Sequence, residues 1–243
     1  MTDTNKIALV SGANKGIGLE IARQLADAGV TVVMGARDIQ AGQAAAKELA
    51  DAGLAVEAIK IDLTIESTIT AAADEISARH GRLDILVNNA GIVDAEDGPP
   101  TAASTAAVRR LMETNFLGTL AVTQAMMPLL RRSPAGRIVN LSTTLGSLSI
   151  NGDPTSPYYE ARLLGYNASK AALNMMTVQL AAELRDTQIA VNAVAPGYVR
   201  TDLTGGSGFM TPAEGARLPV EYALLGDDAV SGRFVEPQGA VPW

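Results

Sequence analysis

Short, almost continuous apolar runs alternate with longer amphipathic stretches along most of this chain. Strands are expected at 7–10, 31–34, 56–61, 85–87, 137–141, 189–194 and 232–235. Helices are expected between them, at 16–28, 39–52, 65–80, 108–130 and 166–185. Strands that are apolar on both faces and are linked by helices form a parallel sheet covered on both sides. The pattern therefore predicts an α/β fold, a doubly wound parallel sheet of about seven strands with helices on both faces.

No linker, repeat or low-complexity segment divides the 243 residues, which are enough for one sizeable core. We therefore expect a single domain over residues 1–243. Two segments rich in Gly and Pro, 146–161 and 202–219, interrupt the alternation. Each follows the carboxyl end of a strand, the edge at which open parallel sheets bind ligands, so both are candidates for substrate contact.

Composition excludes several classes of function. A formal net charge of −7 argues against a nucleic-acid partner, because phosphate backbones select basic surfaces. The chain has no Cys, a single His (His80) and no clustered carboxylate motif, so no metal site is expected. No apolar run approaches the length of a membrane span, and the start, MTDTNKIALV, does not resemble a signal peptide. We expect no membrane contact and a cytoplasmic protein.

A glycine-rich turn, SGANKGIG, joins the first strand to the first helix. Its glycines allow a tight turn and a close backbone approach to a ligand, and the helix N-terminus offers N–H groups and a positive dipole to a pyrophosphate. The spacing is G-x-x-x-G-x-G, and glycines also close ordinary turns, but this position favours dinucleotide binding. The residues expected to bind the cofactor here are Gly12, Asn14, Lys15, Gly16, Ile17 and Gly18.

The end of the second strand indicates which dinucleotide is bound. Ala36 occupies the position at which a carboxylate would accept from a ribose 2′-hydroxyl, and Arg37 follows it. Lys15 adds a second cation in the glycine turn. The two could be ordinary surface cations, but both are expected at one end of the same crevice. Because charge-assisted contacts contribute about 1.5–3 kcal/mol each, the pair would favour NADPH over NADH by roughly 10²–10⁴-fold.

Tyr166 and Lys170, in the stretch YNASK, are four residues apart at the start of an expected helix and therefore share one face. They could be an exposed pair on a solvated surface. Alternatively, the ammonium group could activate the phenol. Free tyrosine has a pKa near 10, and lowering it by about three units requires roughly 4 kcal/mol of differential stabilisation of the phenolate. A neighbouring ammonium acts in that direction.

Several further motifs follow in a fixed order along the chain. They are Asp62 after the third strand, Asn88-Asn89-Ala90-Gly91 after the fourth, Asn115 in the long helix, Ser142 after the fifth strand, and Pro196-Gly197 followed by Thr201. Together with the glycine turn, Tyr166 and Lys170, this set resembles the short-chain dehydrogenase/reductase family over nearly the whole chain. The resemblance implies a Rossmann fold, with a cofactor half at about 1–140 and a catalytic and substrate half at about 141–243.

The resemblance also implies roles for these residues in a nicotinamide-dependent oxidoreductase. Tyr166 would be the general acid, or the base in the reverse direction, and Ser142 would donate a hydrogen bond to the substrate oxygen. Lys170 would also bind the ribose hydroxyls, and Asn115 would hold a water that links Lys170 to solvent. The further cofactor contacts that it implies are Asp62, Leu63, Asn89, Ala90, Gly91, Tyr166, Lys170, Pro196, Gly197, Val199 and Thr201.

Within the family, SGANKGIG, GARD and the final Val241-Pro242-Trp243 resemble the carbonyl reductase branch. This implies NADPH-dependent reduction of a ketone or aldehyde. Phe209 and Met210 favour a non-polar substrate under a glycine-rich lid, whereas Tyr158 and Tyr159 could line the pocket or only pack the 146–161 segment down.

Three other functions stay open: an NADP-dependent alcohol dehydrogenase, an imine reductase, and a non-catalytic NADP(H)-binding sensor. The intact Ser142, Tyr166 and Lys170 argue against the sensor. The resemblance also implies a possible homo-oligomer, paired through the two long helices around Asn115 and Tyr166. Carbonyl reductases with an insert before the tyrosine can be monomers, but this insert is short.

Overall fold

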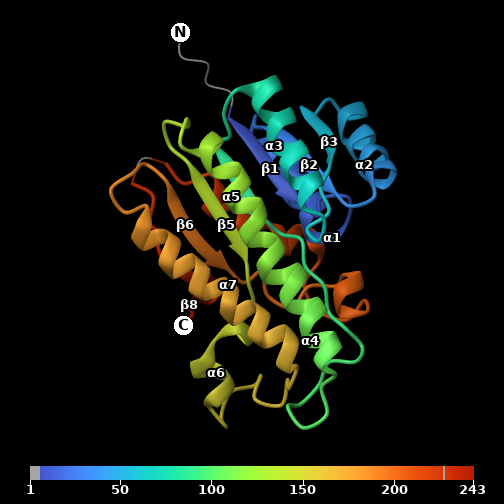
Figure 1. Cartoon of the computed structure of the whole chain (residues 1–243), viewed down its shortest axis with the longest axis vertical. Helices are drawn as coiled ribbons and strands as arrows, with labels where there is room; N and C mark the ends of the chain where they lie inside the picture. The colour runs from blue at the N-terminus through green and yellow to red at the C-terminus, as the bar shows by residue number, and fades with distance from the viewer. Residues whose placement is uncertain (1–5, 227) are drawn as a thin grey trace.

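An eight-stranded sheet forms the centre of the molecule in the computed structural model, which describes residues 6–226 and 228–243 (Figure 1). Its strand order is β3-β2-β1-β4-β5-β6-β7-β8. All neighbouring pairs are parallel except β7 and β8. The strands are β1 (Ile7–Ser11), β2 (Thr31–Ala36), β3 (Val56–Lys60), β4 (Ile85–Asn88), β5 (Arg137–Leu141), β6 (Ala190–Val194), β7 (Phe234–Glu236) and β8 (Gly239–Ala240). The predicted doubly wound α/β fold is confirmed, and the sheet has one strand more than the expected seven.

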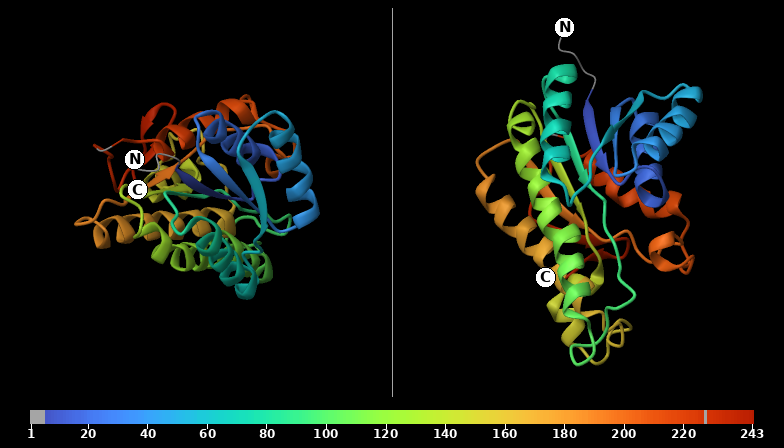
Figure 2. Two further views of the ribbon diagram at one scale, coloured as in Figure 1. Left: turned by 90° about the horizontal axis from the view of Figure 1, so that it is seen from above. Right: turned by 45° about the vertical axis from the view of Figure 1, so that its right-hand side comes forward.

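Helices cover both faces of this sheet, which Figure 2 shows edge-on between two helical layers in its left view. One layer contributes α1, α2 and α8 to a buried core that includes Ile21, Leu49 and Val220. The other contributes α3, α5 and the end of α7, with Ile76 and Met126 in its core. The helices are α1 (Gly16–Asp27), α2 (Ile39–Asp51), α3 (Glu66–His80), α4 (Thr105–Met112), α5 (Thr119–Leu130), α6 (Leu148–Gly152), α7 (Leu164–Glu183) and α8 (Pro212–Ala223). Within the described residues, no helix combines the length and the apolar character needed to cross a bilayer.

The long helix expected at 108–130 is longer and less regular than predicted. It begins at Thr105, where the Ser104 side chain caps α4, and it continues through a π-helical turn, η1 (Glu113–Gly118), into α5. A π-turn widens the backbone by one residue and is frequent at functional sites. Asn115 lies in this turn, so the irregularity falls at one of the predicted catalytic positions.

Two helices were not predicted, because both lie in segments rich in Gly, Pro and Ser. The short α6 is capped by Ser147 and occupies the start of the 146–161 segment. The longer α8 begins in the 202–219 segment, and its first turn carries a capping box between Thr211 and Glu214, with Pro212 at the first helical position. Both signals mark a helix start, so α8 could have been found from the sequence.

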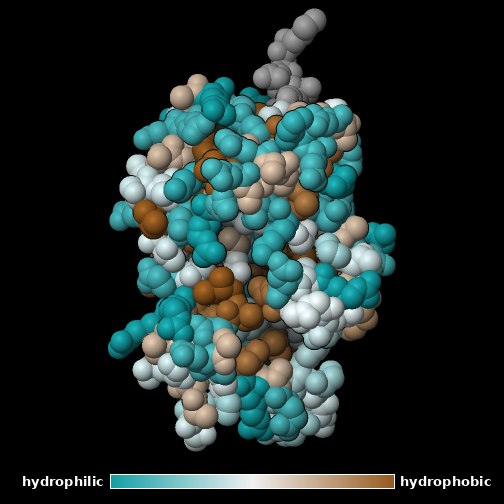
Figure 3. Space-filling model, turned by 90° about the vertical axis from the view of Figure 1, so that its right-hand side faces the viewer, coloured by the Kyte–Doolittle hydropathy of each residue, from teal (hydrophilic) through white to brown (hydrophobic). Residues whose placement is uncertain are grey.

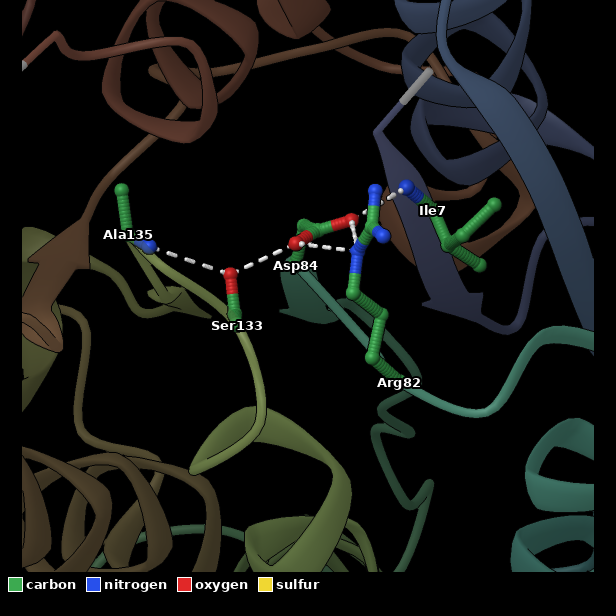
Figure 4. A network of polar contacts seen from close by, with 5 residues as sticks. All are labelled: Ile7, Arg82, Asp84, Ser133 and Ala135. Carbon is green, nitrogen blue, oxygen red and sulfur yellow. Dashed lines mark hydrogen bonds and ion pairs between the residues drawn. The ribbon is translucent and has the colours of Figure 1, made fainter. Parts of the chain in front are cut away.

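A buried carboxylate ties three strands together at the amino-terminal edge of the sheet (Figure 4). Asp84 precedes β4 and accepts hydrogen bonds from the N–H of Ile7 at 2.9 Å and from the hydroxyl of Ser133 at 2.6 Å. The Arg82 guanidinium donates to both carboxylate oxygens, at 3.2 and 3.1 Å. The backbone of Asp84 also bridges Ile7 and Arg137. This network therefore fixes the starts of β1, β4 and β5.

Replacing Asp84 by alanine is expected to lower the free energy of unfolding by about 3 kcal/mol, because a partly buried guanidinium, a hydroxyl and a buried N–H group lose their acceptor. Urea unfolding at pH 7 measures this loss. As a control, alanine at Asp51, whose side chain is 65% exposed beside Lys47, should cost no more than about 0.5 kcal/mol. Equal losses for the two variants would show that the network does not stabilise the sheet.

Candidate active site

The predicted site residues gather at the carboxyl-terminal edge of the sheet, opposite the Asp84 network. The strands β1, β4, β5 and β6 are parallel neighbours, so the segments that follow them lie side by side. Figure 3 shows hydrophobic side chains gathered in a hollow on the side of the molecule that faces right in Figure 1. The hollow lies toward the end of the molecule to which these strands point.

The glycine turn, residues 11–18, forms a concave backbone surface, here called the glycine cradle, which side chains at its glycines would fill. Gly12 and Gly16 have φ angles of +65° and +59°, which only glycine adopts without strain. A Cβ on Gly18 would overlap the Asn89 side chain and the Gly12 carbonyl oxygen. No side chain caps the start of α1, so its first N–H groups are available to phosphate oxygens. The turn therefore fits the pyrophosphate of a dinucleotide.

The Asn88–Gly91 motif braces this cradle from the neighbouring strand. Asn89 donates from its side chain to the carbonyl oxygens of Ser11 and Gly12, at 2.8 and 3.1 Å. The Ser11 hydroxyl accepts from the N–H groups of Asn89 and Ala90, each at 3.1 Å. Gly91 lies near η1 and α7: a Cβ there would be 3.4 Å from Asn115 Oδ1 and 3.5 Å from Lys170 Nζ. These contacts connect the glycine turn, through the segment after β4, to η1 and α7.

Arg37 and Asp62 lie at the same edge, after the neighbouring strands β2 and β3. Arg37 is exposed and makes no hydrogen bond or ion pair with any described residue. Burial opposes ionisation of Asp62, but hydrogen bonds from Thr64 and the charges of Arg37 and Lys60 hold the pKa of Asp62 below its ordinary value. Arg37 is thus available to an anionic ligand beside an ionised carboxylate.

Lys15 has a partner that the sequence did not indicate. Its ammonium group donates to Asp202 Oδ2 at 2.6 Å, across the edge between the glycine turn and the loop that follows β6. Both side chains are largely exposed, 67% for Lys15 and 80% for Asp202. Thr201 lies at the same place, because a Cβ on Gly16 would be 3.5 Å from its Cγ2. In this structure the Lys15 ammonium is therefore paired with Asp202, and its contact with a cofactor phosphate stays a prediction.

Tyr166 and Lys170 lie on the first turns of α7, where burial governs their ionisation. Lys170 donates from Nζ to the carbonyl oxygen of Leu141 at 2.8 Å, and burial lowers the pKa of Lys170 to about 8. Burial raises the pKa of Tyr166 to about 12. The lowering of this pKa by Lys170 that the sequence led us to expect is therefore not found in the protein alone, where desolvation of the phenolate sets the direction of the shift.

The Ser142 hydroxyl is directed to an unexpected partner. It donates to Asn174 Oδ1 at 2.6 Å, and both residues are buried. The orientation of the amide is set by its Nδ2, which donates to the carbonyl oxygen of Gly146 at 3.2 Å. In this structure Ser142 is therefore a donor to Asn174, whereas the sequence predicted a donor to the substrate oxygen. Asn174 was missed, although it lies four residues after Lys170 on the same helix.

Asn115 is fully buried, and its side chain is occupied by protein partners. Its Oδ1 accepts from the N–H of Ile92 at 2.8 Å, and its Nδ2 donates to the Ile92 carbonyl at 3.0 Å and to Ser169 Oγ at 3.1 Å. These bonds join the π-turn η1 to the segment after Gly91 and to α7. The side chain therefore fixes η1 relative to α7, and the water predicted beside it stays a prediction.

The loop after β6 forms a closed unit on the substrate side. Gly197 has a φ angle of +90°, and the Met210 sulphur would lie 2.6 Å from a Cβ on it. Val199 pairs with Met210 in a β-bridge. The rings of Tyr198 and Phe209 meet edge to face, with centroids 6.1 Å apart, and Phe209 is 70% exposed. An exposed aromatic pair thus lies on the loop that was predicted to act as a lid.

The 146–161 segment is fixed to both α7 and the C-terminal residues. Asn167, next to Tyr166, donates to Asn151 Oδ1 at 2.9 Å and to the Ala161 carbonyl at 3.0 Å. Ser149 donates to the carbonyl oxygen of Trp243 at 3.2 Å. Tyr159 lies under the Arg162 guanidinium, 4.9 Å from its ring centre, so this ring packs the segment down. Tyr158 is 38% exposed.

Comparison with known proteins then decides the family, because the sequence profile described as short chain dehydrogenase matches residues 6–208. This chain belongs to the short-chain dehydrogenase family. The short-chain dehydrogenase anuI of Penicillium roqueforti is 37% identical over 245 residues, which cover 98% of this chain and 96% of that protein. Carbonyl reductase (NADPH) 1 of Sus scrofa is 34% identical over 284 residues, with 100% and 96% covered. The structure of salutaridine reductase from Papaver somniferum matches with a TM-score of 0.82 at 32% identity, covering 95% of this chain and 99% of that one.

This short-chain dehydrogenase is therefore an enzyme of NAD(P)-dependent oxidoreduction, and its resemblance to the carbonyl reductases is confirmed. The residues present fit the cofactor, since the uncapped α1 and the glycine cradle accept a pyrophosphate. The Lys170 ammonium donates a hydrogen bond to the carbonyl oxygen of Leu141, the residue directly before Ser142. Within the described part of the chain, no group of three or more His, Asp or Glu residues could hold a metal ion.

Proposed function

We propose that this enzyme reduces the carbonyl group of a ketone or aldehyde to an alcohol, with NADPH as the hydride donor. The observation that carries the proposal is the bond from Lys170 Nζ to the Leu141 carbonyl. This bond joins α7, which carries Tyr166, to the end of β5, directly before Ser142. The three residues with the required chemistry thus belong to one packed unit beside the glycine cradle.

The cofactor supplies the hydride, and the protein supplies orientation and the proton. Tyr166, with a pKa of about 12, keeps its proton at neutral pH and donates it to the carbonyl oxygen. Lys170, with a pKa of about 8, is an ammonium at neutral pH and stabilises the phenolate as it forms. Ser142 assists when its hydroxyl turns from Asn174 to the substrate oxygen.

A non-polar substrate is supported by the side chains around the predicted lid. Tyr198 and Phe209 are 46% and 70% exposed on the loop after β6, and Met210 packs on Gly197 at its base. Exposed aromatic rings gain free energy when an apolar ligand covers them. We therefore propose an apolar carbonyl compound as the substrate class.

Arg37 is proposed to select NADPH by binding the 2′-phosphate, because it follows Ala36 and its guanidinium makes no hydrogen bond or ion pair with a described residue. Replacing Arg37 by aspartate is expected to weaken NADPH binding by about tenfold to hundredfold more than NADH binding, since one charge-assisted contact is lost. Fluorescence titration of both cofactors measures this ratio. As a control, Arg185→Asp changes the same charge on an exposed side chain after α7 and should leave the ratio unaltered. Equal losses for NADPH and NADH in Arg37→Asp would contradict the assignment.

A further inference from the structure

The N-terminus of α7 is capped by a carboxylate from a distant part of the chain. Asp97 accepts from the N–H of Gly165 at 2.8 Å through Oδ1, and from the N–H of Tyr166 at 2.9 Å through Oδ2. The first N–H groups of a helix lack partners within it, and the positive end of its dipole attracts anions. The residue that directly precedes the helix, Leu163, supplies no side-chain cap. Asp97 thus fulfils the capping role at the turn that carries the phenol.

Residues 94–98, here called the acidic strap, join this cap to α4. Asp94 and Glu96 both pair with Arg110 of α4, at 2.7 Å each. Hydrogen bonds to these two carboxylates, and to a lesser extent their charges, raise the pKa of Arg110 above its ordinary value. Oδ1 of Asp97 also accepts from the N–H of Gly98 at 2.9 Å, which fixes the carboxylate within the strap. The strap is therefore anchored on α4 at one end and on α7 at the other.

The contact between the strap and α7 is close because Gly165 has no side chain. A Cβ there would lie 2.7 Å from Leu111 Cδ1 and 3.2 Å from Asp97 Oδ1. Leu164 adds a backbone bond, donating from its N–H to the carbonyl oxygen of Gly98 at 2.9 Å. The two residues immediately before Tyr166 are therefore held by backbone contacts, and the turn has little freedom to shift.

Within the described part of the chain, the Asp97 carboxylate has no cationic partner. Among residues 6–226 and 228–243, no Lys, Arg or His lies within ion-pair distance of Asp97, unlike Asp94 and Glu96 in the same strap. Among the described residues, its side chain accepts hydrogen bonds only from backbone N–H groups, two of which belong to the first turn of α7. The charge of Asp97 therefore acts on the helix end and not on a side chain.

We propose that Asp97 is a positioning residue for Tyr166. By capping the first turn of α7, it fixes the phenol relative to Ser142 and to the cofactor cradle. The inference rests on the proposed function, in which Tyr166 donates the proton. A shift of about 1 Å at a reacting group can cost about 10²-fold in rate, so a cap at the backbone of the acid itself has a direct catalytic consequence.

The test compares Asp97→Ala and Asp97→Asn with Asp94→Asn, a matched change three residues away that loses only a contact to Arg110. For Asp97→Ala we expect kcat for NADPH-dependent ketone reduction to fall by about tenfold to hundredfold. Asp97→Asn should lower kcat less, because the amide oxygen of the asparagine still accepts a hydrogen bond from the first turn of α7. The NADPH dissociation constant should stay within about twofold of the wild type, because the cradle is formed by β1, α1 and β4. Asp94→Asn should leave kcat within about threefold.

Hydrogen exchange read by NMR at the Gly165 and Tyr166 amides gives a readout that does not depend on turnover. Both amides should exchange about tenfold faster in Asp97→Ala and remain at the wild-type rate in Asp94→Asn. Unchanged amides, or unchanged kcat despite faster exchange, would overturn the proposal. So would a loss of NADPH affinity equal to the loss of kcat, since that indicates a general structural role.

Failure of the proposed function has a different signature. It would appear as a wild-type enzyme that binds NADPH and reduces no carbonyl compound. In that case the amide exchange rates still decide whether Asp97 caps the turn. The environment of the phenol can be followed through the ¹³Cζ resonances of the five tyrosines, assigned with Tyr166→Phe. A Tyr166 resonance that does not move in Asp97→Ala would overturn the positioning role.

Discussion

Replacing Tyr166 by phenylalanine is expected to lower kcat for carbonyl reduction by about 10²–10⁴-fold, the range that general acid catalysis contributes. The variant keeps the ring and loses only the hydroxyl that carries the transferred proton. Since burial raises the pKa of Tyr166 to about 12, the wild-type phenol is protonated throughout the neutral range and is ready to donate. Initial rates of NADPH consumption with a saturating ketone measure the loss.

NADPH binding should survive this change, because the phosphate cradle and Arg37 are untouched. Tyr159→Phe is the matched control: its ring packs under Arg162 in the 146–161 segment, and the loss of its hydroxyl should leave kcat within about threefold. A Tyr166→Phe enzyme that retains more than about a tenth of the wild-type kcat would show that another group supplies the proton.

Replacing Gly18 by alanine is expected to weaken NADPH binding by about fivefold to hundredfold, because overpacking by one methyl group costs about 1–3 kcal/mol. The added Cβ would overlap the Asn89 side chain and the carbonyl oxygen of Gly12. Asn89 holds the cradle through Ser11 and Gly12, so its displacement also loosens the turn. Calorimetric titration with NADPH measures the affinity.

Thermal unfolding of the same preparations separates a damaged cradle from a damaged fold. Gly226→Ala is a suitable control, since a Cβ there meets nothing within 4 Å. Its NADPH affinity should match that of the wild type. If Gly18→Ala binds NADPH as tightly as Gly226→Ala does, the glycine turn is not the phosphate site.

The sheet could be predicted from the sequence because burial on both faces leaves a strong local signal. Each of the strands β1, β4 and β5 is a run of buried residues, and the helices between them show an apolar face. The strand β8, Gly239–Ala240, is too short and too exposed to leave such a signal. The helix α8 was missed because its Gly and Pro content outweighed the capping box at Thr211 and Glu214.

The sequence predicted which residues belong to the candidate site better than it predicted the partners to which they form hydrogen bonds. Motif order placed Ser142, Tyr166 and Lys170 near one another, and the structure brings their elements together. The partners Asn174, Asp202 and Asp97 could not be read from local patterns, because each is brought to its site residue by tertiary packing 32, 187 and 69 residues away, respectively. The direction of the pKa shift at Tyr166 depends on burial, which the spacing of a tyrosine and a lysine does not reveal.

The central claim is that this enzyme transfers hydride from NADPH to a carbonyl carbon, and one measurement tests it most directly. Consumption of NADPH and of NADH should be followed with the wild-type enzyme over a panel of apolar ketones, aldehydes and cyclic imines. We predict turnover with ketones or aldehydes, at higher kcat/KM with NADPH than with NADH. Turnover confined to imines would contradict the carbonyl substrate, and tight NADPH binding without turnover on any compound would favour a sensor over a reductase.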